Sequence, residues 1–370
     1  MRRRSFLAAP FAAVPLAAAS GPDSHVYANT DGIPHTPRDY ARLLAALTEN
    51  DKVQRDDFSR GGVVQTLETR MAELLGKETA VWMPTGTLAN HLAVRLLAGS
   101  RRRVLVQAES HLFNDSGDCA QTLSGLHLIP LAPGRATFTL GEVEEAVQKA
   151  AGGRVETPIG AIQIETPVRR RAGERFRFDE MQRICAWARE RGIGLHLDGA
   201  RLFLESVYTG SPVTRYTALF DTVYVSLYKY FNASAGAILA GPKALLDNIY
   251  HTRRMFGGGL PQVWPSAAVA LHYLDGFEQR FRTAVDNAEA VIAKLASDAS
   301  FAVERVPEGT NIFRLRVNGV NIPTYLNRLE AAGITIQPPV GDDWYLVRVN
   351  ETWARVPADE IYNRFRAALG

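Results

Sequence analysis

Short apolar runs alternate with amphipathic helical segments from about residue 60 to residue 240, and this alternation constrains the fold most. The helical pattern over Phe178–Arg191 stops at Gly192, the buried run 193–197 follows, and another run lies at 222–227. Strands that are apolar on both faces and separated by helices form a mostly parallel sheet with helices on both sides. The run Ala237–Ala240 follows after only a short turn, so we expect this strand to be antiparallel.

The same pattern predicts an α/β fold with a large domain and a smaller C-terminal α/β domain. The expected strands of the large domain are 80–83, 104–106, 126–129, 161–164, 193–197, 222–227 and 237–240. The expected helices are 64–75, 85–97, 140–150 and 178–191. After Gly257–Gly259, long helical segments are expected over 265–296. Strands at 312–315, 334–336 and 345–348 and a helix at 323–332 are expected in the tail. Two domains suit 370 residues, because single cores stop growing at roughly 250–300 residues.

The N-terminus has the features of a targeting segment. Arg3-Arg4-Ser5-Phe6-Leu7 resembles the twin-arginine export pattern, an Ala-rich stretch follows to Ala19, and Ala17–Ser20 offers small residues for cleavage. We therefore expect a signal peptide at 1–20 and a periplasmic or exported protein. The alternative is a basic tail on a cytoplasmic protein. The remaining division is an N-terminal segment at 21–60, the large domain at 61–256, and a helical connection with the small domain at 257–370.

The charge balance gives no indication of nucleic-acid binding. The chain has 42 basic and 39 acidic residues, and removal of Arg2–Arg4 leaves 39 of each. The clusters Arg101–Arg103 and Arg169–Arg171 are interpreted as solvated surface. No run after residue 20 is apolar enough to span a bilayer. Cys119 and Cys185 could pair, but Cys185 lies in a helical pattern and is expected to be a buried free thiol.

Two polar residues follow neighbouring strands of the predicted sheet. Asp198 ends the apolar run 193–197, and Lys229 follows the run 222–227. Ligands bind beyond the carboxyl ends of parallel strands, where these two side chains should meet. The pair suits a pyridine cofactor, because lysine forms an imine and the carboxylate keeps the ring nitrogen protonated. The alternatives are that Asp198 caps the following helix and that Lys229 is an exposed strand terminus.

Five motifs in order resemble the threonine aldolase and β-eliminating lyase family. In chain order they are Pro84–Asn90, Ser110–His111, His196–Phe203, Ser226–Lys229 and Gly257–Gly259, and His196–Phe203 is the most specific. The resemblance covers roughly residues 55 to 350. It implies an aspartate-aminotransferase-like fold, pyridoxal 5′-phosphate (PLP) as cofactor, an amino acid as the small-molecule substrate, and a homodimer or homotetramer. It gives no reason to expect a metal.

The resemblance also assigns roles near the cofactor ring. Lys229 would carry the cofactor, Asp198 would contact the ring nitrogen, and His111 would stack on the ring and assist proton transfer. Arg201 would lie near the phenolic oxygen or the lysine. The alternative for Arg201 is an arginine on the protein surface. The alternative for His111 is a loop histidine whose polar atoms are hydrogen-bonded and that has no role at the cofactor.

Other residues would bind anions. Thr85-Gly86-Thr87 opens a helix, whose first amides carry partial positive charge and would hold the cofactor phosphate, with Ser226 as a further donor. Ordinary capping also explains a threonine there. Arg348, at a strand end, resembles the arginine that pairs with the substrate carboxylate. Arg253 and Arg254 would contact a cofactor phosphate, either that of their own subunit or that of the other subunit of a dimer.

The chain departs from the family on the substrate side. Asn114–Asp118 replaces a usual Tyr-Glu and paired glycines, and Glu165–Val168 replaces Glu-Asn-Thr-His. A further histidine is replaced near Val155 or Glu156, and an arginine near Pro261. The cofactor machinery is therefore expected to be retained while the substrate side chain is left open.

The leading hypothesis is cleavage of the Cα–Cβ bond of a β-hydroxy-α-amino acid to glycine and an aldehyde, with His111 or a bound water as the base. β-Elimination or transamination on the same scaffold is the second hypothesis, and a catalytically silent binding protein is the third. A nicotinamide-binding sheet would need a Gly-x-Gly-x-x-Gly turn after its first strand, which is absent.

Overall fold

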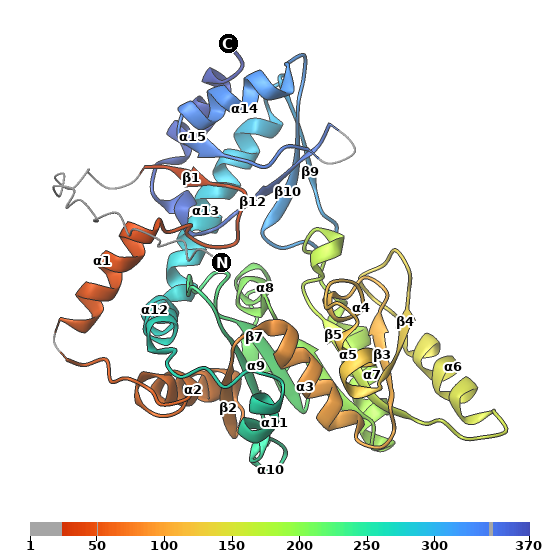
Figure 1. Cartoon of the computed structure of the whole chain (residues 1–370). Coiled ribbons are helices and arrows are strands. Elements are labelled where there is room, and N and C mark those ends of the chain that lie inside the picture. The colour runs from red at the N-terminus through yellow and green to blue at the C-terminus, as the bar shows by residue number, and fades with distance from the viewer. Residues whose placement is uncertain (1–23, 50, 340–342) are drawn as a thin grey trace, which may run out of the picture.

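A seven-stranded sheet forms the larger of two lobes (Figure 1). The computed structural model describes residues 24–49, 51–339 and 343–370, so the expected signal peptide lies outside it. Along the sheet the strands are β2 (Thr79–Met83), β8 (Ala237–Gly241), β7 (Thr222–Ser226), β6 (Gly194–Asp198), β5 (Ile159–Glu165), β3 (Arg103–Gln107) and β4 (His127–Leu131). Only β8 runs antiparallel, against both β2 and β7, which confirms the expectation for residues 237–240.

Helices cover both faces of this sheet. They are α2 (Gly62–Leu75), α3 (Gly86–Ala98), α4 (His111–Asn114), α5 (Cys119–Ser124), α6 (Leu140–Ala151), α7 (Phe178–Glu190), α8 (Leu202–Thr209), α9 (Val213–Thr217), α10 (Lys243–Leu246) and α11 (Ile249–Met255), with a 3₁₀ turn η1 (Arg169–Arg171). Alternate residues of β2 enter different cores: Ala80 and Trp82 pack with α2, whereas Val81 and Met83 pack with α3. This alternation is the strand periodicity that buries both faces.

Local signals set the helix ends as expected. Helix α2 ends at Gly76, which has a left-handed backbone (φ 59°) and donates to the last carbonyls of the helix. Helix α6 begins with a capping box, in which Thr139 and Glu142 satisfy each other's backbone amides. The helical segments expected over 265–296 are α12 (Trp264–Leu274) and α13 (Phe277–Ala296), which are separated at Gly276, where φ is 69°.

The smaller lobe holds two short sheets. Strands β9 (Phe301–Arg305), β10 (Ile312–Val317) and β12 (Tyr345–Arg348) form an antiparallel sheet, and β1 (Val26–Tyr27) pairs in parallel with β11 (Ile334–Thr335). The remaining helices are α1 (Pro37–Thr48), α14 (Ile322–Ala331), η2 (Glu351–Ala354) and α15 (Ala358–Ala367). The N-terminal segment is thus part of the sheet structure of the C-terminal lobe, a pairing over about 300 positions that local sequence does not show (Figure 1).

Some expectations concern single residues. Cys185 is a buried free thiol in α7, as predicted, and Cys119 is also unpaired. Within the described part of the chain, no helix has the length and hydropathy needed to cross a membrane. The same residues contain no group of three His, Cys, Asp or Glu side chains placed to hold a metal ion.

Candidate active site

A cavity of about 470 Å³ opens beyond the carboxyl ends of β5, β6 and β7. Strand register places Glu165 beside Asp198, and Asp198 beside Tyr224. The smaller lobe contributes Arg348, and the segment after β1 contributes Asn29 to Asp31. The cavity is lined by Asn29, Thr30, Asp31, His111, Glu165, Arg169, Asp198, Ala200, Arg201, Tyr224, Tyr228, Lys229, Gln337 and Arg348. Five residues singled out from the sequence, His111, Asp198, Arg201, Lys229 and Arg348, therefore meet in one cavity.

Asp198 is held by a buried chain of hydrogen bonds. Asn90 Nδ2, on α3, donates to Asp198 Oδ2 at 2.6 Å, and the amide of Ala200 donates to Oδ1 at 3.2 Å. Asn90 Oδ1 lies 2.8 Å from His196 Nε2, and His196 Nδ1 lies 2.8 Å from Thr222 Oγ1. Burial lowers the pKa of His196 to about 3, so the ring is neutral and bonds without adding charge. Asp198 does not cap α8, whose N-cap is Arg201.

Lys229 lies on the turn after β7 with its amine against aromatic rings. Its Nζ lies 4.7 Å from the centre of the Tyr228 ring and 3.4 Å from the Tyr228 hydroxyl. Burial, followed by the charge of Arg201, lowers the lysine pKa to about 8, although Asp198, Asp31 and Glu165 act in the opposite direction. A substantial fraction of the amine is thus unprotonated near neutral pH, as a nucleophilic lysine requires.

His111 is the first residue of α4, and its ring is held by Ser116. Ser116 Oγ lies 3.2 Å from His111 Nδ1 and donates to the His111 carbonyl at 3.1 Å. If the hydroxyl proton is used on the carbonyl, Nδ1 carries a proton and donates to Oγ, which leaves Nε2 as an acceptor. Burial lowers the His111 pKa, Asp198 raises it and Lys229 lowers it. The neutral ring can therefore accept a proton.

Glu165 forms the wall between His111 and Asp198. Its Oε2 accepts from the His111 amide at 2.6 Å, and its Oε1 accepts from the Arg169 amide at 2.9 Å. Burial, reinforced by the charge of Asp198, raises the Glu165 pKa to about 7. The sequence showed this residue only as part of a departure from a motif.

Arg201 and Arg348 both face Asp31. Arg201 Nε and Nη2 lie 2.9 and 2.7 Å from Asp31 Oδ2, whereas Arg348 Nη1 is 3.8 Å from Oδ1. Arg348 Nη1 is buried and has no hydrogen-bond partner among the described residues. Burial alone would raise the Asp31 pKa, but the two arginines hold it far below its usual range. Arg348 thus retains a donor on the cavity wall that can bind an anion.

The residues predicted to hold a phosphate lie next to this cavity rather than on its wall. Thr85 is the N-cap of α3 and accepts from the Leu88 amide at 3.1 Å, so the plain capping interpretation also holds. The amides of Gly86 and Thr87 have no acceptor within the helix. A Cβ on Gly86 would lie 2.0 Å from the hydroxyl of Tyr224, a residue that lines the cavity. Tyr224 thus connects the helix start to the cavity.

Ser226 supports the same anion site. Its hydroxyl is buried and has no hydrogen-bond partner of good geometry among the described residues, although the Tyr224 phenol lies beside it. A buried unsatisfied hydroxyl is costly and indicates a missing ligand atom. The positions of Ser226, Gly86 and Thr87 therefore suit a phosphate.

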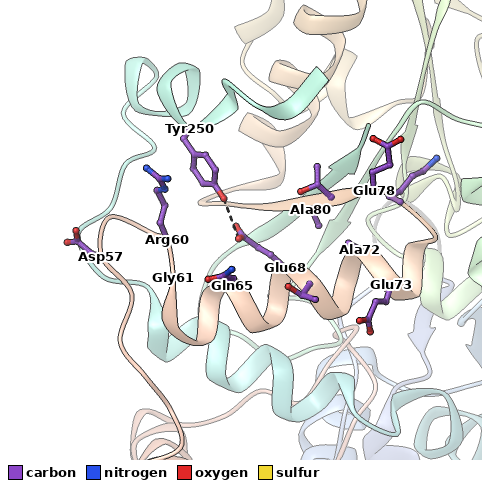
Figure 2. Close-up of a pocket in the computed structure, with 13 residues that line it drawn as sticks. Asp57, Arg60, Gly61, Gln65, Glu68, Ala72, Glu73, Glu78, Ala80 and Tyr250 are labelled. Atoms are coloured by element: carbon purple, nitrogen blue, oxygen red, sulfur yellow. Dashed lines mark hydrogen bonds between the residues drawn. The ribbon is translucent and has the colours of Figure 1, made fainter. Parts of the chain in front are cut away.

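Arg253 and Arg254 do not reach this cavity within the chain. Arg253 is buried and donates to the carbonyls of Trp82 and Phe58, and Arg254 lies over the Phe58 ring. Arg253 also lies over the ring of Tyr250. Tyr250 lines a second cavity of about 740 Å³ between α2, β2 and α11 (Figure 2). There Glu68 accepts from the Trp82 amide and the Tyr250 hydroxyl, and burial raises its pKa to about 7. Asp57 and Lys77 both line this second cavity, but Lys77 Nζ donates to the Phe220 carbonyl, and neither residue follows the carboxyl end of a sheet strand. It is therefore not the candidate active site.

Sequence reasoning missed the residues that orient the charged groups. Asn90 was quoted in a motif without a role, and Asp31 lay in a segment without a function. Arg169 is exposed, as interpreted from the sequence, although it also borders the cavity. The position of Asn90 three residues after Thr87, about one helical turn into α3, could have signalled a contact with a strand end, because its side chain there bonds to Asp198 and His196 of β6. No local signal could have found Asp31.

A profile of the beta-eliminating lyase family matches residues 35–317. The aldolase vrtJ of Penicillium aethiopicum is 33% identical over 232 residues, 62% of this chain and 58% of that protein, so the match spans less than two thirds of vrtJ. A probable low-specificity L-threonine aldolase 2 of Arabidopsis thaliana is 29% identical over 284 residues, 76% of each chain. Among solved structures, a putative L-allo-threonine aldolase from Listeria monocytogenes has a TM-score of 0.77 and 28% identity over 93% of this chain and 95% of that one.

The cavity fits PLP, which a solved serine palmitoyltransferase of the same fold contains. Lys229 offers an amine of lowered pKa, Asp198 offers a fixed carboxylate, and Ser226 offers an unsatisfied hydroxyl on the phosphate side. The profile covers most of the chain, and the strand ends that it includes form this cavity. The chain therefore belongs to the beta-eliminating lyase family, and PLP is its cofactor.

Proposed function

We propose that this protein is a PLP-dependent lyase that cleaves the Cα–Cβ bond of a β-hydroxy-α-amino acid, giving glycine and an aldehyde. The observation that carries the proposal is the meeting of Lys229, Asp198 and His111 in one cavity with the free donor of Arg348. Similarity to threonine aldolases over most of the chain supports it.

The cofactor, when bound, supplies an electron sink for the bond that breaks at Cα. Lys229 Nζ is the amine that would hold it, and the lowered pKa keeps a nucleophilic fraction. Asp198, fixed by Asn90 and the Ala200 amide, would place a negative charge at the ring nitrogen. These residues set the chemistry at Cα but do not choose which bond breaks.

Arg348 would orient the substrate by binding its α-carboxylate. The guanidinium ends β12 and keeps a buried Nη1 without a partner among the described residues. A charge-assisted pair there contributes roughly 1.5–3 kcal/mol to binding. Fixing the carboxylate also fixes the rotation about the Cα–N bond, and this decides which Cα substituent is aligned for cleavage.

His111 would remove the β-hydroxyl proton at Nε2. The contact of Nδ1 with Ser116 favours the tautomer with a free Nε2, and the lowered pKa keeps the ring unprotonated. The backbone bond to Glu165 holds the residue in position. A neutral, oriented imidazole is a competent general base.

Incubation of the purified holoprotein with threonine or phenylserine should release glycine and an aldehyde. The variant His111→Asn should lose most of this activity, whereas His91→Asn, a buried histidine on α3 bonded to Ser124, serves as the matched control. Formation of a keto acid and ammonia instead would select β-elimination, the activity in the name of the family. The absence of any product from a broad panel of β-hydroxy amino acids would overturn both.

Two further proposals concern the setting of the enzyme. We propose that residues 1–20 direct export through the twin-arginine route and that the chain forms a homodimer or homotetramer. The arginine pair and the Ala-rich stretch support the first proposal. Fractionation of cells that express the full chain, with Arg3 and Arg4 changed to Lys as a control, tests export, and light scattering tests assembly.

A further inference from the structure

The segment from Asn29 to Ile33 is fixed over the turn that carries Lys229. Asn350 Nδ2 donates to the carbonyls of Tyr27, Thr30 and Gly32, at 2.6, 2.8 and 3.2 Å. The Ile33 amide donates to Asn232 Oδ1 at 2.7 Å. The segment is therefore bonded to the small lobe through Asn350 and to the large lobe through Asn232.

Gly32 shows how close this approach is. A Cβ on Gly32 would lie 2.1 Å from the Lys229 carbonyl oxygen and 2.3 Å from Asn232 Oδ1. Backbone atoms cannot move aside at such distances, so only glycine fits. The fit fixes the position of the preceding residue, Asp31, on the cavity wall.

Asp31 divides its two oxygens unequally between the arginines. Oδ2 takes two contacts from Arg201, at 2.9 and 2.7 Å, and Oδ1 lies 3.4 Å from Asn311 Nδ2 and 3.8 Å from Arg348 Nη1. The side chains of Asp31 and Arg201 are both 9% exposed. Asp31 is therefore paired with Arg201 at hydrogen-bonding distance, whereas its distance to Arg348 is longer.

The charge of the cavity depends on this pairing. Its lining has four basic side chains, Arg169, Arg201, Lys229 and Arg348, and three acidic ones, Asp31, Glu165 and Asp198. Arg169 pairs with Asp115, outside this lining. Replacement of Asp31 by a neutral residue would leave the Arg201 guanidinium without its buried partner.

We propose that Asp31 is a specificity-determining residue: its carboxylate occupies Arg201, leaves only Arg348 to receive a carboxylate, and so restricts the site to amino acids without a second acidic group. The inference rests on the proposed function for the identity of the substrate class. A side-chain carboxylate near Arg201 would face Asp31, a buried like charge, and like charges there disfavour binding.

Binding of unreactive carboxylates to the holoprotein tests this inference. Butyrate and succinate have the same chain length and differ by one carboxylate, and titration calorimetry measures both affinities. Wild-type protein should bind butyrate more tightly than succinate. Asp31→Asn should raise the affinity for succinate relative to butyrate by about tenfold, the usual effect of one charge-assisted contact. The ratio of kcat/KM for 3-hydroxyaspartate to that for threonine should rise in parallel, through KM rather than kcat.

Asp298→Asn is the matched control. Asp298 is also 9% exposed and pairs with Arg366 and Tyr362, but it lies at the end of α13 in the small lobe. This variant should keep the wild-type ratio of succinate to butyrate affinity, and thermal unfolding shows that both variants fold. If Asp31→Asn does not fold, the inference is tested by whether the wild-type protein binds butyrate more tightly than succinate.

An unchanged ratio in folded Asp31→Asn, or wild-type protein that prefers succinate, would overturn the inference. Because butyrate and succinate are not cleaved, these results do not depend on bond cleavage. A failure of the proposed function appears instead as a lack of product from β-hydroxy amino acids.

Discussion

Asn90 should determine how firmly the protein holds its cofactor, although it does not line the cavity. Its side-chain nitrogen donates to Asp198 Oδ2 at 2.6 Å, and its side-chain oxygen accepts from His196 Nε2 at 2.8 Å. The substitution Asn90→Leu keeps the branching of the side chain and removes both bonds. Asp198 then keeps only the Ala200 amide as a partner among these contacts.

The size of the effect follows from the charge on Asp198. A hydrogen bond to a charged group contributes about 1.5–3 kcal/mol. If that amount is lost from the carboxylate that faces the ring nitrogen, the Kd for PLP rises by about 10- to 150-fold, since about 1.4 kcal/mol is a factor of ten. Titration of the apoprotein with PLP, followed by absorbance or by quenching of tryptophan fluorescence, measures the Kd directly.

His91→Leu is the control, because His91 is the next residue of α3, is buried, and bonds to Ser124 Oγ at 2.6 Å on the side away from Asp198. Each substitution removes a buried hydrogen bond and should lower the free energy of unfolding by about 1–3 kcal/mol. Only Asn90→Leu should weaken cofactor binding. Equal Kd values for the two variants would refute the assignment of Asn90 to the support of Asp198.

Three further predictions concern the same site. The rate at which the apoprotein binds PLP should rise with pH around the Lys229 pKa of about 8, since only the free amine reacts. Stopped-flow absorbance measures this rate, and a rate that does not rise with pH would contradict the placement of Lys229. Ser226→Ala should raise the Kd for PLP by about 10-fold or more and leave the Kd for pyridoxal, which has no phosphate, unchanged. Titration with both compounds measures the two values. Glu165 has a folded pKa raised to about 7 from 4.5, so the folded state binds more protons than the unfolded state between these values, and stability falls as pH rises through that window. Compared with Glu165→Gln, which has no such titration, the wild-type protein should lose up to about 3 kcal/mol of unfolding free energy from pH 4.5 to 7 in denaturant titrations; parallel curves would contradict it.

The residues that follow strands could be predicted from the sequence because the end of an apolar run is a local signal. Asp198 and Lys229 each end an apolar run, and parallel strands bring such ends to one edge. The antiparallel direction of β8 could be predicted from the short connection between β7 and β8. The start of α3 and the end of α2 followed from Thr85 and Gly76, whose capping roles depend on a few neighbouring residues.

The partners of these residues could not be predicted, because they come from distant parts of the chain. Asp31 pairs with Arg201 across 170 positions, and Asn350 holds the carbonyl of Tyr27 across 323. Such contacts depend on how the lobes and the N-terminal segment pack, and no periodicity in the sequence records that. Strand β1 is too short, at two residues, to show a strand pattern.

The place of these residues in the fold coincides with the proposed division between cofactor and substrate. Lys229, Asp198, Ser226 and the start of α3 belong to the large sheet and its helices, so their positions are tied to strand register and change only if the fold changes. Arg348 and Asp31 belong to the small lobe and to the segment that pairs with it. Substitutions in those parts can alter which side chain is accepted without disturbing the cofactor. A lyase of this fold can therefore keep one chemistry at Cα and vary its substrate through residues far from the strand ends.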